Sequence, residues 1–399
     1  MNKLALLKDY ANYVDEKINK RELNRTNYIG VDNILPDRGG IKTSEYFSGK
    51  GKAIAFKKGD ILIGNIRPYF KKIWLATFEG GCDADVLCIR PKDNISSEFL
   101  YAALSTDFFF DYVVKGSKGS KMPRGDKNHI MQFPIMDIDN KQRIGEFVVR
   151  LNKEIANNNA ISKELESMAK TIYDYWFLQF EFPDKDGKPY KSNGGKMVWN
   201  DQLKQEIPER WKVNNLYKIA NFINGIACQK YRPVDDKHKL PVIKITEMHN
   251  GFTSNTEYVQ DSIDEDHIIN NGDILFSWSA SLETMIWNRG KGGLNQHIFK
   301  VIPKDEISLH FVYQTLSSYI INFKRMAEAR KTTMGHITRD HLEQSRIVIP
   351  PKDLIDKFEN AVKSFYEQIT IVDRESEQLK SLRDFLLPLL MNGQVTIEG

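Results

Sequence analysis

The chain has 399 residues, of which 41% are hydrophobic and 28% are charged, and its formal net charge is +4. This composition excludes disorder as the main state, and the length predicts two domains of ordinary size. The sequence has no apolar run of the roughly 20 residues that span a bilayer and begins without a secretory signal, so we expect a cytoplasmic protein with no membrane partner. Cys82, Cys88 and Cys228 match no zinc or redox spacing, and we expect them reduced and buried.

The chain contains a long internal repeat. Residues 59–63, Gly-Asp-Ile-Leu-Ile, recur as residues 272–276, Gly-Asp-Ile-Leu-Phe, and residues 91–96 recur as residues 303–308. Further matches in this register are Phe99 with Phe311, Tyr101 with Tyr313, Leu104 with Leu316, Ser105 with Ser317, Met122 with Met334, His129 with His341 and Gln132 with Gln344. Because each copy is long enough to bury a core of its own, the repeat predicts two homologous modules.

Each module combines strands with a helix. Short β-rich runs separated by Gly, Pro and Asn turns predict strands at residues 60–63, 73–78, 86–89, 273–276, 284–287 and 298–302. Residues 99–112 and 309–330 lack helix breakers and space their apolar residues helically, so each predicts a helix. The modules are therefore predicted to be mixed α and β.

A long heptad stripe follows each module. The first comprises Ile144, Val148, Leu151, Ile155, Asn158, Ser162, Leu165, Ala169 and Ile172, and the second Ile355, Phe358, Val362, Phe365, Ile369, Val372, Ser376, Leu379, Leu382 and Leu386, ending at Pro388 and Gly393. A single stripe is typical of a helix packed on its own module. Two matched stripes instead favour two helices of about 35 residues and about 50 Å, paired antiparallel with a module at each end. The polar Asn158, Ser162 and Ser376 are candidates for fixing the register of this pair.

The predicted fold class is α+β, with two tandem mixed α/β modules, each followed by a long helix, and the two helices pairing as an antiparallel coiled coil. The expected boundaries are a first module at 1–139, a first spacer helix at 140–182, a linker at 183–210, a second module at 211–351, a second spacer helix at 352–392 and a tail at 393–399. The linker assignment rests on its many breakers and charges.

Motifs for catalysis are missing from the sequence. The Gly-Lys pairs lack the rest of a phosphate-binding loop, and the only Pro-Pro, at residues 350–351, lacks the acceptor and aromatic neighbours of an amino-methyltransferase. Asp184, Asp186 and Lys188 resemble nuclease ligands but lie together in the expected linker, without the rigid support that a metal site needs. We therefore expect no catalytic residue, no metal and no cofactor, and a structural role for His129 and His341.

Positive charge gathers at matching places in the two modules. Residues 115–127 carry five cations and one carboxylate on a Gly- and Ser-rich loop, and residues 324–339 are again basic and rich in hydroxyls. Such segments are often merely solvated, but their recurrence favours contact with DNA phosphates and bases. The candidate DNA-binding residues are Arg67, Tyr69, Lys118, Lys121, Arg124 and Lys127 in the first module, and Lys230, Tyr231, Arg232, Arg330, Lys331, Thr332, Thr333 and His336 in the second.

The segment after the first stripe carries a family resemblance. It contains Lys-Glu-Leu-Glu at 163–166, Tyr-Asp-Tyr-Trp-Phe at 173–177, Phe-Glu-Phe-Pro-Asp at 180–184, Gly-Lys-Pro-Tyr-Lys at 187–191, Gly-Gly-Lys-Met-Val-Trp at 194–199 and Ile-Pro-Glu-Arg-Trp at 207–211. With the module-helix repeat, the chain closely resembles the specificity subunit of type I restriction-modification systems over essentially its whole length. It departs from the pattern at the first module, which lacks an Ile-Pro-Glu-Arg-Trp lead-in, so a shorter N-terminus is expected.

The resemblance implies a non-catalytic subunit. Each module would be a target-recognition domain for one half of a split, asymmetric site in double-stranded DNA, and the helices would set the gap. Two adenine methyltransferase subunits and motor-nuclease restriction subunits would be the partners. The alternative from the residues is a coiled-coil adaptor joining two protein-binding modules, with basic loops that serve solubility. An autonomous nuclease or methyltransferase has no motif in its favour.

Overall fold

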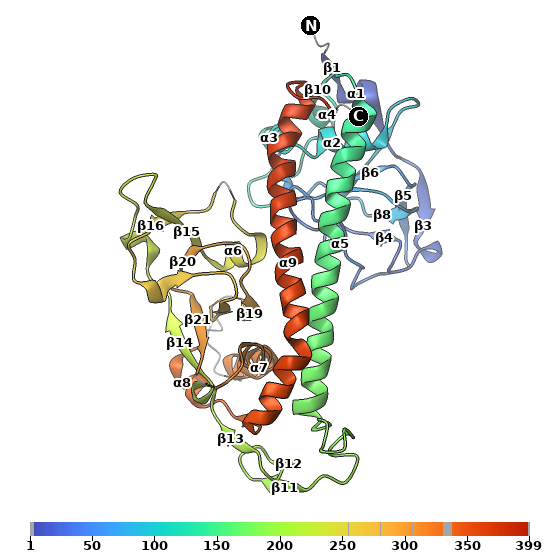
Figure 1. The fold of residues 1–399 in the computed structure, drawn as a ribbon. Helices are drawn as coiled ribbons and strands as arrows, with labels where there is room; N and C mark the ends of the chain where they lie inside the picture. Colours follow the sequence, from blue (N-terminus) through green and yellow to red (C-terminus); the bar gives the residue numbers. More distant parts are fainter. Residues whose placement is uncertain (1–3, 254, 280, 305, 330–336, 398–399) are drawn as a thin grey trace. The chain divides into compact units, whose positions relative to one another are not determined.

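The computed structural model describes residues 4–253, 255–279, 281–304, 306–329 and 337–397 (Figure 1). The chain forms two compact units. The first unit comprises Met1–Asn158 with Ser376–Gly399, and the second comprises Asn159–Glu375. Each unit thus contains one module together with a part of both long helices.

Two four-stranded sheets and a short ribbon form the first unit's module. One sheet has the order β2-β9-β6-β7 and the other the order β3-β5-β8-β4, while β1 pairs with β10. The bounds are β1 Leu4–Leu6, β2 Ala11–Tyr13, β3 Lys17–Asn19, β4 Tyr28–Ile29, β5 Lys52–Phe56, β6 Ile61–Gly64, β7 Ile73–Leu75, β8 Gly80–Cys82, β9 Val86–Pro91 and β10 Pro134–Met136. The predicted strands at 60–63, 73–78 and 86–89 are confirmed as β6, β7 and β9.

The helices of this module are short. They are α1 Leu7–Tyr10, α2 Ser97–Leu104, α3 Asp107–Lys115 and α4 Lys127–Ile130. The single helix predicted over 99–112 is wrong, because the chain breaks between α2 and α3. Thr106 adopts an extended conformation there and caps α3, its hydroxyl oxygen accepting a hydrogen bond from the backbone N–H of Phe109.

The second unit repeats this architecture. Its sheets have the orders β14-β21-β18-β19 and β16-β15-β20-β17, β13 pairs with β22, and β11 pairs with β12 in an additional hairpin. The bounds are β11 Met197–Asn200, β12 Gln205–Pro208, β13 Lys212–Asn214, β14 Ala220–Asn224, β15 Lys239–Ile243, β16 Tyr258–Gln260, β17 Ile268–Ile269, β18 Ile274–Ser277, β19 Glu283–Ile286, β20 Gly292–Leu294, β21 Ile298–Pro303 and β22 Ile347–Ile349. The helices of this module are α6 Ile245–Asn250, α7 Leu309–Ala329 and α8 Arg339–Glu343.

The strand pairings support the internal repeat. The central pair β6 and β9 of the first unit matches β18 and β21 of the second, in the same antiparallel sense. In the other sheet, the parallel pair of β4 with β8 matches the parallel pair of β15 with β20. The units differ in where the fourth strand of this sheet is added: β3 pairs with β5 in the first unit, whereas β16 pairs with β15, at the opposite edge of the shared three strands, in the second. The repeated sequence therefore specifies a shared core, and the outer strand varies.

The segment between the modules is folded onto the second unit. Phe182 stacks on Tyr190, with ring centroids 4.5 Å apart, and on Trp211 at 5.2 Å. Ile207 of β12 is 2% exposed. Asp184 accepts hydrogen bonds from the backbone N–H groups of Asp186 and Lys188, which lowers the pKa of its carboxyl. Asp184 thus stabilises a turn.

Two long helices, α5 Lys141–Tyr173 and α9 Lys352–Met391, pass through both units, and a π-helical turn at Asp174–Leu178 extends α5. In the first unit, Ile144 and Val148 of α5 share a core with Leu387 and Leu390 of α9. Asn152, further along α5, bonds Arg383, earlier on α9. The helix segments in this unit therefore run antiparallel.

The same direction holds in the second unit. Ser162 of α5 donates a hydrogen bond to Asp373 of α9 over 2.6 Å, and Tyr173, one end of α5, contacts Phe358 near the start of α9. Asn158 and Ser376 are buried, at 7% and 2% exposed, and Ser162 is half-buried. Ser162 thus pairs with a specific residue on the other helix, as expected for a polar group that fixes register.

The predicted end of the second stripe is wrong. Leu382 is 43% exposed, and the buried positions near the end of α9 are instead Arg383, Leu387 and Leu390. Pro388 does not end the helix, which continues to Met391; Gly393, with a positive φ of 71°, follows its end. The heptad spacing predicted the wrong buried positions here because Arg383, a charged residue, is buried with polar partners between the two helices.

Across the described residues, no helix is long and apolar enough to cross a membrane. Cys82, Cys88 and Cys228 are buried free thiols, as predicted.

Candidate nucleic-acid interface

The basic loop of the first unit has a defined conformation. Lys118 and Arg124 exchange two backbone hydrogen bonds, 2.9 and 3.0 Å long, which close the loop into a short ribbon. Gly119 has a φ of +96°, a conformation that glycine adopts readily. Asp126 then caps α4 by accepting from the backbone N–H groups of Asn128 and His129. The loop is therefore held at both of its ends.

This ribbon lies against the loop that follows β6. Ile66 and Arg124 form a β-bridge, and the backbone N–H of Arg67 donates to the carbonyl of Pro123 over 2.8 Å. Tyr69, in the 3-10 turn Pro68–Phe70, is 49% exposed. The structure thus brings Arg67 and Tyr69, which are far from residues 118–124 in the sequence, to the same edge of the module.

Carboxylates accompany several of the candidate cations. Lys118 pairs with Asp126 over 2.5 Å, and Arg124 pairs with Asp85 over 3.0 Å. The hydrogen bond from Lys118, with those from the backbone, lowers the pKa of Asp126 to about 2. The ammonium of Lys127 lies 5.5 Å from the ring centre of Tyr13. Lys121 is exposed and has no ion pair among the residues described. Phosphates would have to compete with carboxylates for Lys118 and Arg124.

A cleft of about 640 Å³ borders this edge and includes residues that the sequence did not reveal. Tyr46, which is 94% exposed, lies on its wall, as does Lys42. Lys72 donates to the carbonyl of Val31 over 2.7 Å, and burial lowers the pKa of its ammonium. These residues come from separate loops, and only the tertiary fold brings them together.

The second unit also has a contact between the loop after its central strand and its basic segment. The backbone N–H of Ile337, within the basic segment 324–339, donates to the carbonyl of Trp278, the first residue after β18, over 3.0 Å. The indole Nε1 of Trp278 donates to Asn224 over 3.2 Å, and its ring lies 5.7 Å from that of His297. Sequence analysis missed all three of these side chains. The repeat register of β6 and β18 was the signal that pointed to this loop.

The other candidates of the second module are less well defined. Lys230 ends the 3-10 turn Cys228–Lys230, and Tyr231, which is 38% exposed, accepts a backbone hydrogen bond from Gln260. Lys230 and Arg232 are exposed. Arg330, Lys331, Thr332, Thr333 and His336 lie outside the described residues.

The two matched histidines have local partners. His129 stacks on Tyr112, with ring centroids 4.1 Å apart. His341 is 3% exposed, and its Nδ1 accepts from the backbone N–H of Thr338 over 3.0 Å. Both contacts support the structural role predicted for these histidines. Within the described part of the chain, no group of three His, Cys, Asp or Glu side chains is placed to hold a metal.

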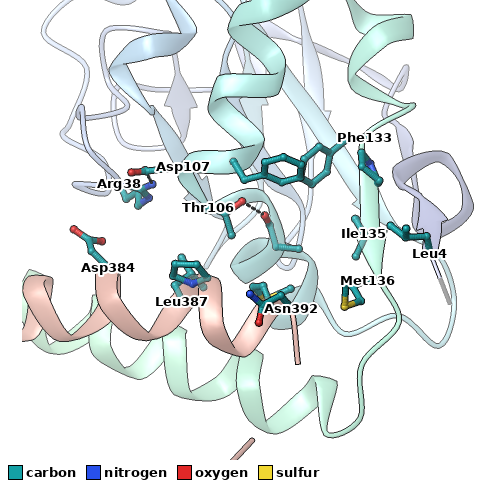
Figure 2. A pocket seen from close by; sticks show the side chains of 15 residues that line it. Leu4, Arg38, Thr106, Asp107, Phe133, Ile135, Met136, Asp384, Leu387 and Asn392 are labelled. Atoms are coloured by element: carbon teal, nitrogen blue, oxygen red, sulfur yellow. Dashed lines mark hydrogen bonds and ion pairs between the residues drawn. The ribbon is translucent and has the colours of Figure 1, made fainter. Parts of the chain in front are cut away.

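An apolar cavity of about 470 Å³ lies elsewhere in the first unit, between the start of α3, β10 and the end of α9 (Figure 2). Leu4, Phe133, Ile135, Met136 and Leu387 line it. Its buried arginine, Arg38, is paired with Asp107. None of the candidate DNA-binding residues lines it, and its apolar walls do not suit a phosphate.

Comparison with known proteins identifies the class. Residues 7–167 and 208–381 match the family model of the type I restriction modification DNA specificity domain, and the chain belongs to this family. It is therefore a sequence-specific DNA-recognition subunit of a type I restriction-modification complex, and it is not itself an enzyme.

Individual relatives agree with this family. The chain is 24% identical to the type I restriction enzyme MjaIX specificity subunit of Methanocaldococcus jannaschii, covering 86% of this chain and 79% of that one. It is also 24% identical to the HindI specificity subunit of Haemophilus influenzae, covering 86% and 87%. The crystal structure of the type I restriction-modification S subunit from M. genitalium has the same fold, with a TM-score of 0.58 at 14% identity over 100% of this chain and 97% of that one.

Proposed function

We propose that the modules at 1–139 and 211–351 are target-recognition domains, each binding one half of a split, asymmetric DNA site. The spacer helices at 140–182 and 352–392 set the gap between the halves, with a linker at 183–210 and a tail at 393–399. The observation that carries this proposal is that in each module the loop after the central strand contacts the basic segment, through a hydrogen bond from Arg67 to Pro123 in the first module and from Ile337 to Trp278 in the second. The adaptor hypothesis does not explain why basic segments recur at matching sequence positions of both modules.

The proposed DNA contacts are the candidate residues of the two modules. In the first module they are Arg67, Tyr69, Lys118, Lys121, Arg124 and Lys127, and in the second Lys230, Tyr231, Arg232, Arg330, Lys331, Thr332, Thr333 and His336. Lysines and arginines neutralise phosphates, and arginine, threonine and histidine also donate to base edges. Trp278, Asn224 and His297 join the second set, because an indole that contacts both an amide and an imidazole offers stacking and hydrogen bonding in one place.

The proposed partners supply the chemistry. Two adenine methyltransferase subunits dock on this chain and bring the methyl donor, and motor-nuclease restriction subunits complete the enzyme in the cytoplasm. The family assignment supports partners of this class, because a DNA specificity domain directs modification and restriction carried out by other subunits.

Mapping of methylated adenine across the genome tests the proposal. Cells that carry the cognate methyltransferase subunit are compared with and without this chain. A bipartite motif that appears only with the chain is the expected result and gives both half-sites and the gap. If the complex forms but no motif appears, the adaptor hypothesis replaces this one.

A further inference from the structure

We propose that Arg67 reads a guanine in the half-site bound by the first unit, its guanidinium donating to O6 and N7 of that base. The inference rests on the proposed function and deepens it, because it names the residue that determines specificity and the base that it selects.

The backbone of Arg67 is held in an unusual conformation. Its φ of 52° and ψ of 65° lie in the left-handed region, which residues other than glycine seldom adopt. Its N–H donates to Pro123 over 2.8 Å, its carbonyl accepts from Phe70 over 3.0 Å, and Pro68 follows it. Strained residues that the surrounding structure fixes in this way cluster at functional sites. The side chain of Arg67 therefore starts from a rigid point beside the cleft.

In the described part of the chain, the guanidinium of Arg67 has no partner, whereas the neighbouring cations each have one. Lys42, Lys71, Lys118 and Arg124 are each paired with a carboxylate. Among the residues described, no hydrogen bond or ion pair is formed by the Arg67 side chain, and its Nε is buried without an acceptor. The terminal nitrogens of the guanidinium are thus uncommitted in the free chain.

The charges of the cleft favour a base over a phosphate. Arg67, Lys42 and Lys72 line it together with four carboxylates, those of Asp32, Glu45, Asp83 and Asp85. A phosphate entering the cleft would meet more negative than positive groups, whereas a base edge is neutral. In the major groove, guanine presents the acceptors O6 and N7, which arginine binds in a bidentate manner, and the paired cytosine presents an amino donor that a carboxylate can accept. A G·C pair therefore matches both kinds of group on this wall.

The test uses the complete DNA-binding complex and duplexes that carry the mapped site. In the first series, each guanine of each half-site is replaced in turn by 7-deazaguanine, which lacks the N7 acceptor, and binding by the unaltered protein is measured. In the second series, Arg67→Gly removes the side chain without backbone strain, because glycine adopts a positive φ readily. Arg67→Lys keeps the charge but loses the bidentate geometry. Arg21→Ala, an exposed arginine that does not line the cleft, is the matched control.

We expect one guanine of one half-site to be sensitive to 7-deazaguanine. Arg67→Gly should lower discrimination against the other bases at that position roughly 5- to 150-fold. Arg67→Lys should lower it partly, and Arg21→Ala not at all. Discrimination at the other positions of the same half-site stays unchanged and reports that the first unit of the variant is folded.

Other outcomes overturn the inference. If Arg67→Gly weakens binding equally on every DNA sequence and Arg67→Lys binds as tightly as the natural chain, the arginine binds a phosphate. If replacing each guanine by 7-deazaguanine never changes the binding of the unaltered protein, no contact to N7 exists, and no protein variant is needed to show it. If the unaltered complex binds no bipartite site, the proposed function itself has failed, and this result is distinct from a loss of selectivity at one base pair.

Discussion

Arg383 of α9 donates a hydrogen bond from Nη1 to Oδ1 of Asn152 on α5 over 2.9 Å, inside the helix pair of the first unit. The arginine side chain is 5% exposed, and its Nε donates to Asp384 over 2.9 Å. Asn152 in turn donates to the hydroxyl of Tyr101 on α2 over 3.2 Å. A buried polar chain therefore connects both long helices with the module, where the heptad pattern predicted leucine contacts.

Removing this arginine should destabilise the first unit. Arg383→Ala leaves the Oδ1 of the half-buried Asn152 without its charged donor, and we expect the free energy of unfolding to fall by about 1.5–3 kcal/mol. Amide hydrogen exchange followed in each unit is the suitable measurement, because a chain of two units need not unfold in one step. Arg374→Ala, at an exposed position of the same helix, is the control. Equal effects of the two variants would show that the buried bond contributes nothing.

Replacing both partners should be much milder. Arg383→Leu combined with Asn152→Leu leaves neither group unpaired in the helix pair, and apolar replacement of a buried polar pair is often close to neutral. We expect the double variant to regain most of the stability that Arg383→Ala loses, measured by the same exchange experiment. A double variant as unstable as the single one would place the role of Arg383 outside this bond.

The spacer helices offer a test of how the gap is set. The boundary between the units crosses α5 between Asn158 and Asn159 and α9 between Glu375 and Ser376. One heptad inserted at both places adds about 10 Å of helix, or about three base pairs of DNA. We expect methylome mapping to show a longer gap with both half-sites unchanged. A heptad inserted in α5 alone mismatches the two helices and serves as the control. An unaltered gap in the double insertion would show that the helices do not set the gap.

The sequence predicted the elements whose signals are local or repeated. The Gly-Asp-Ile-Leu runs marked β6 and β18, because a buried strand bounded by a tight turn needs that pattern whatever surrounds it. Both long helices followed from apolar spacing alone. The same spacing placed the polar Asn158, Ser162 and Ser376 on the stripes, and the structure buries Asn158 and Ser376.

The errors arose where distant residues decide the outcome. Apolar spacing continues through residues 99–112, but Thr106 caps a new helix, so one predicted helix became two. Arg383, paired with Asn152, occupies the buried position between the helices that apolar spacing had assigned to Leu382. Likewise, Trp278, Asn224 and His297 lie far apart in the sequence, and no linear motif reveals that they meet. Charge clustering found the basic loops but not their aromatic and amide neighbours.

The second unit contains an ion pair that responds to acid. Burial alone would raise the pKa of Glu359, but the hydrogen bond and charge of His310, 2.9 Å away, outweigh it, so the pKa is lowered. A carboxyl with a lowered pKa in the folded state stabilises the fold above its unfolded value of 4.5, and this contribution is lost as the pH falls through the folded pKa. We therefore expect acidification below pH 4.5 to lower the free energy of unfolding of the second unit by about 1 kcal/mol more in the natural chain than in Glu359→Gln.

The measurement is hydrogen exchange of the second unit as a function of pH, corrected for the intrinsic exchange rate. Glu367→Gln, an exposed glutamate on the same helix, is the control and should leave the acid sensitivity unchanged. The same pH profile for Glu359→Gln and the natural chain would contradict the prediction.

The basic loop of the first unit should contribute to one half-site only. Replacing Lys118, Lys121 and Arg124 together with alanine removes up to three phosphate contacts, each of which contributes about 0.9 to the slope of log K against log salt. Lys118 and Arg124 must first give up Asp126 and Asp85, whereas Lys121 has no such pair among the described residues. We therefore expect the slope to become less negative by between about 1 and 3.

The control for this prediction has the same change of charge at another place. Lys185, Lys188 and Lys191 are exposed in the segment between the modules, and their triple alanine variant should leave the slope and both half-sites unaltered. Binding is measured from low to physiological salt on duplexes in which one half-site at a time is scrambled. If the loop variant weakens binding equally whichever half-site is intact, the loop acts through net charge alone, and its assignment to the first half-site is wrong.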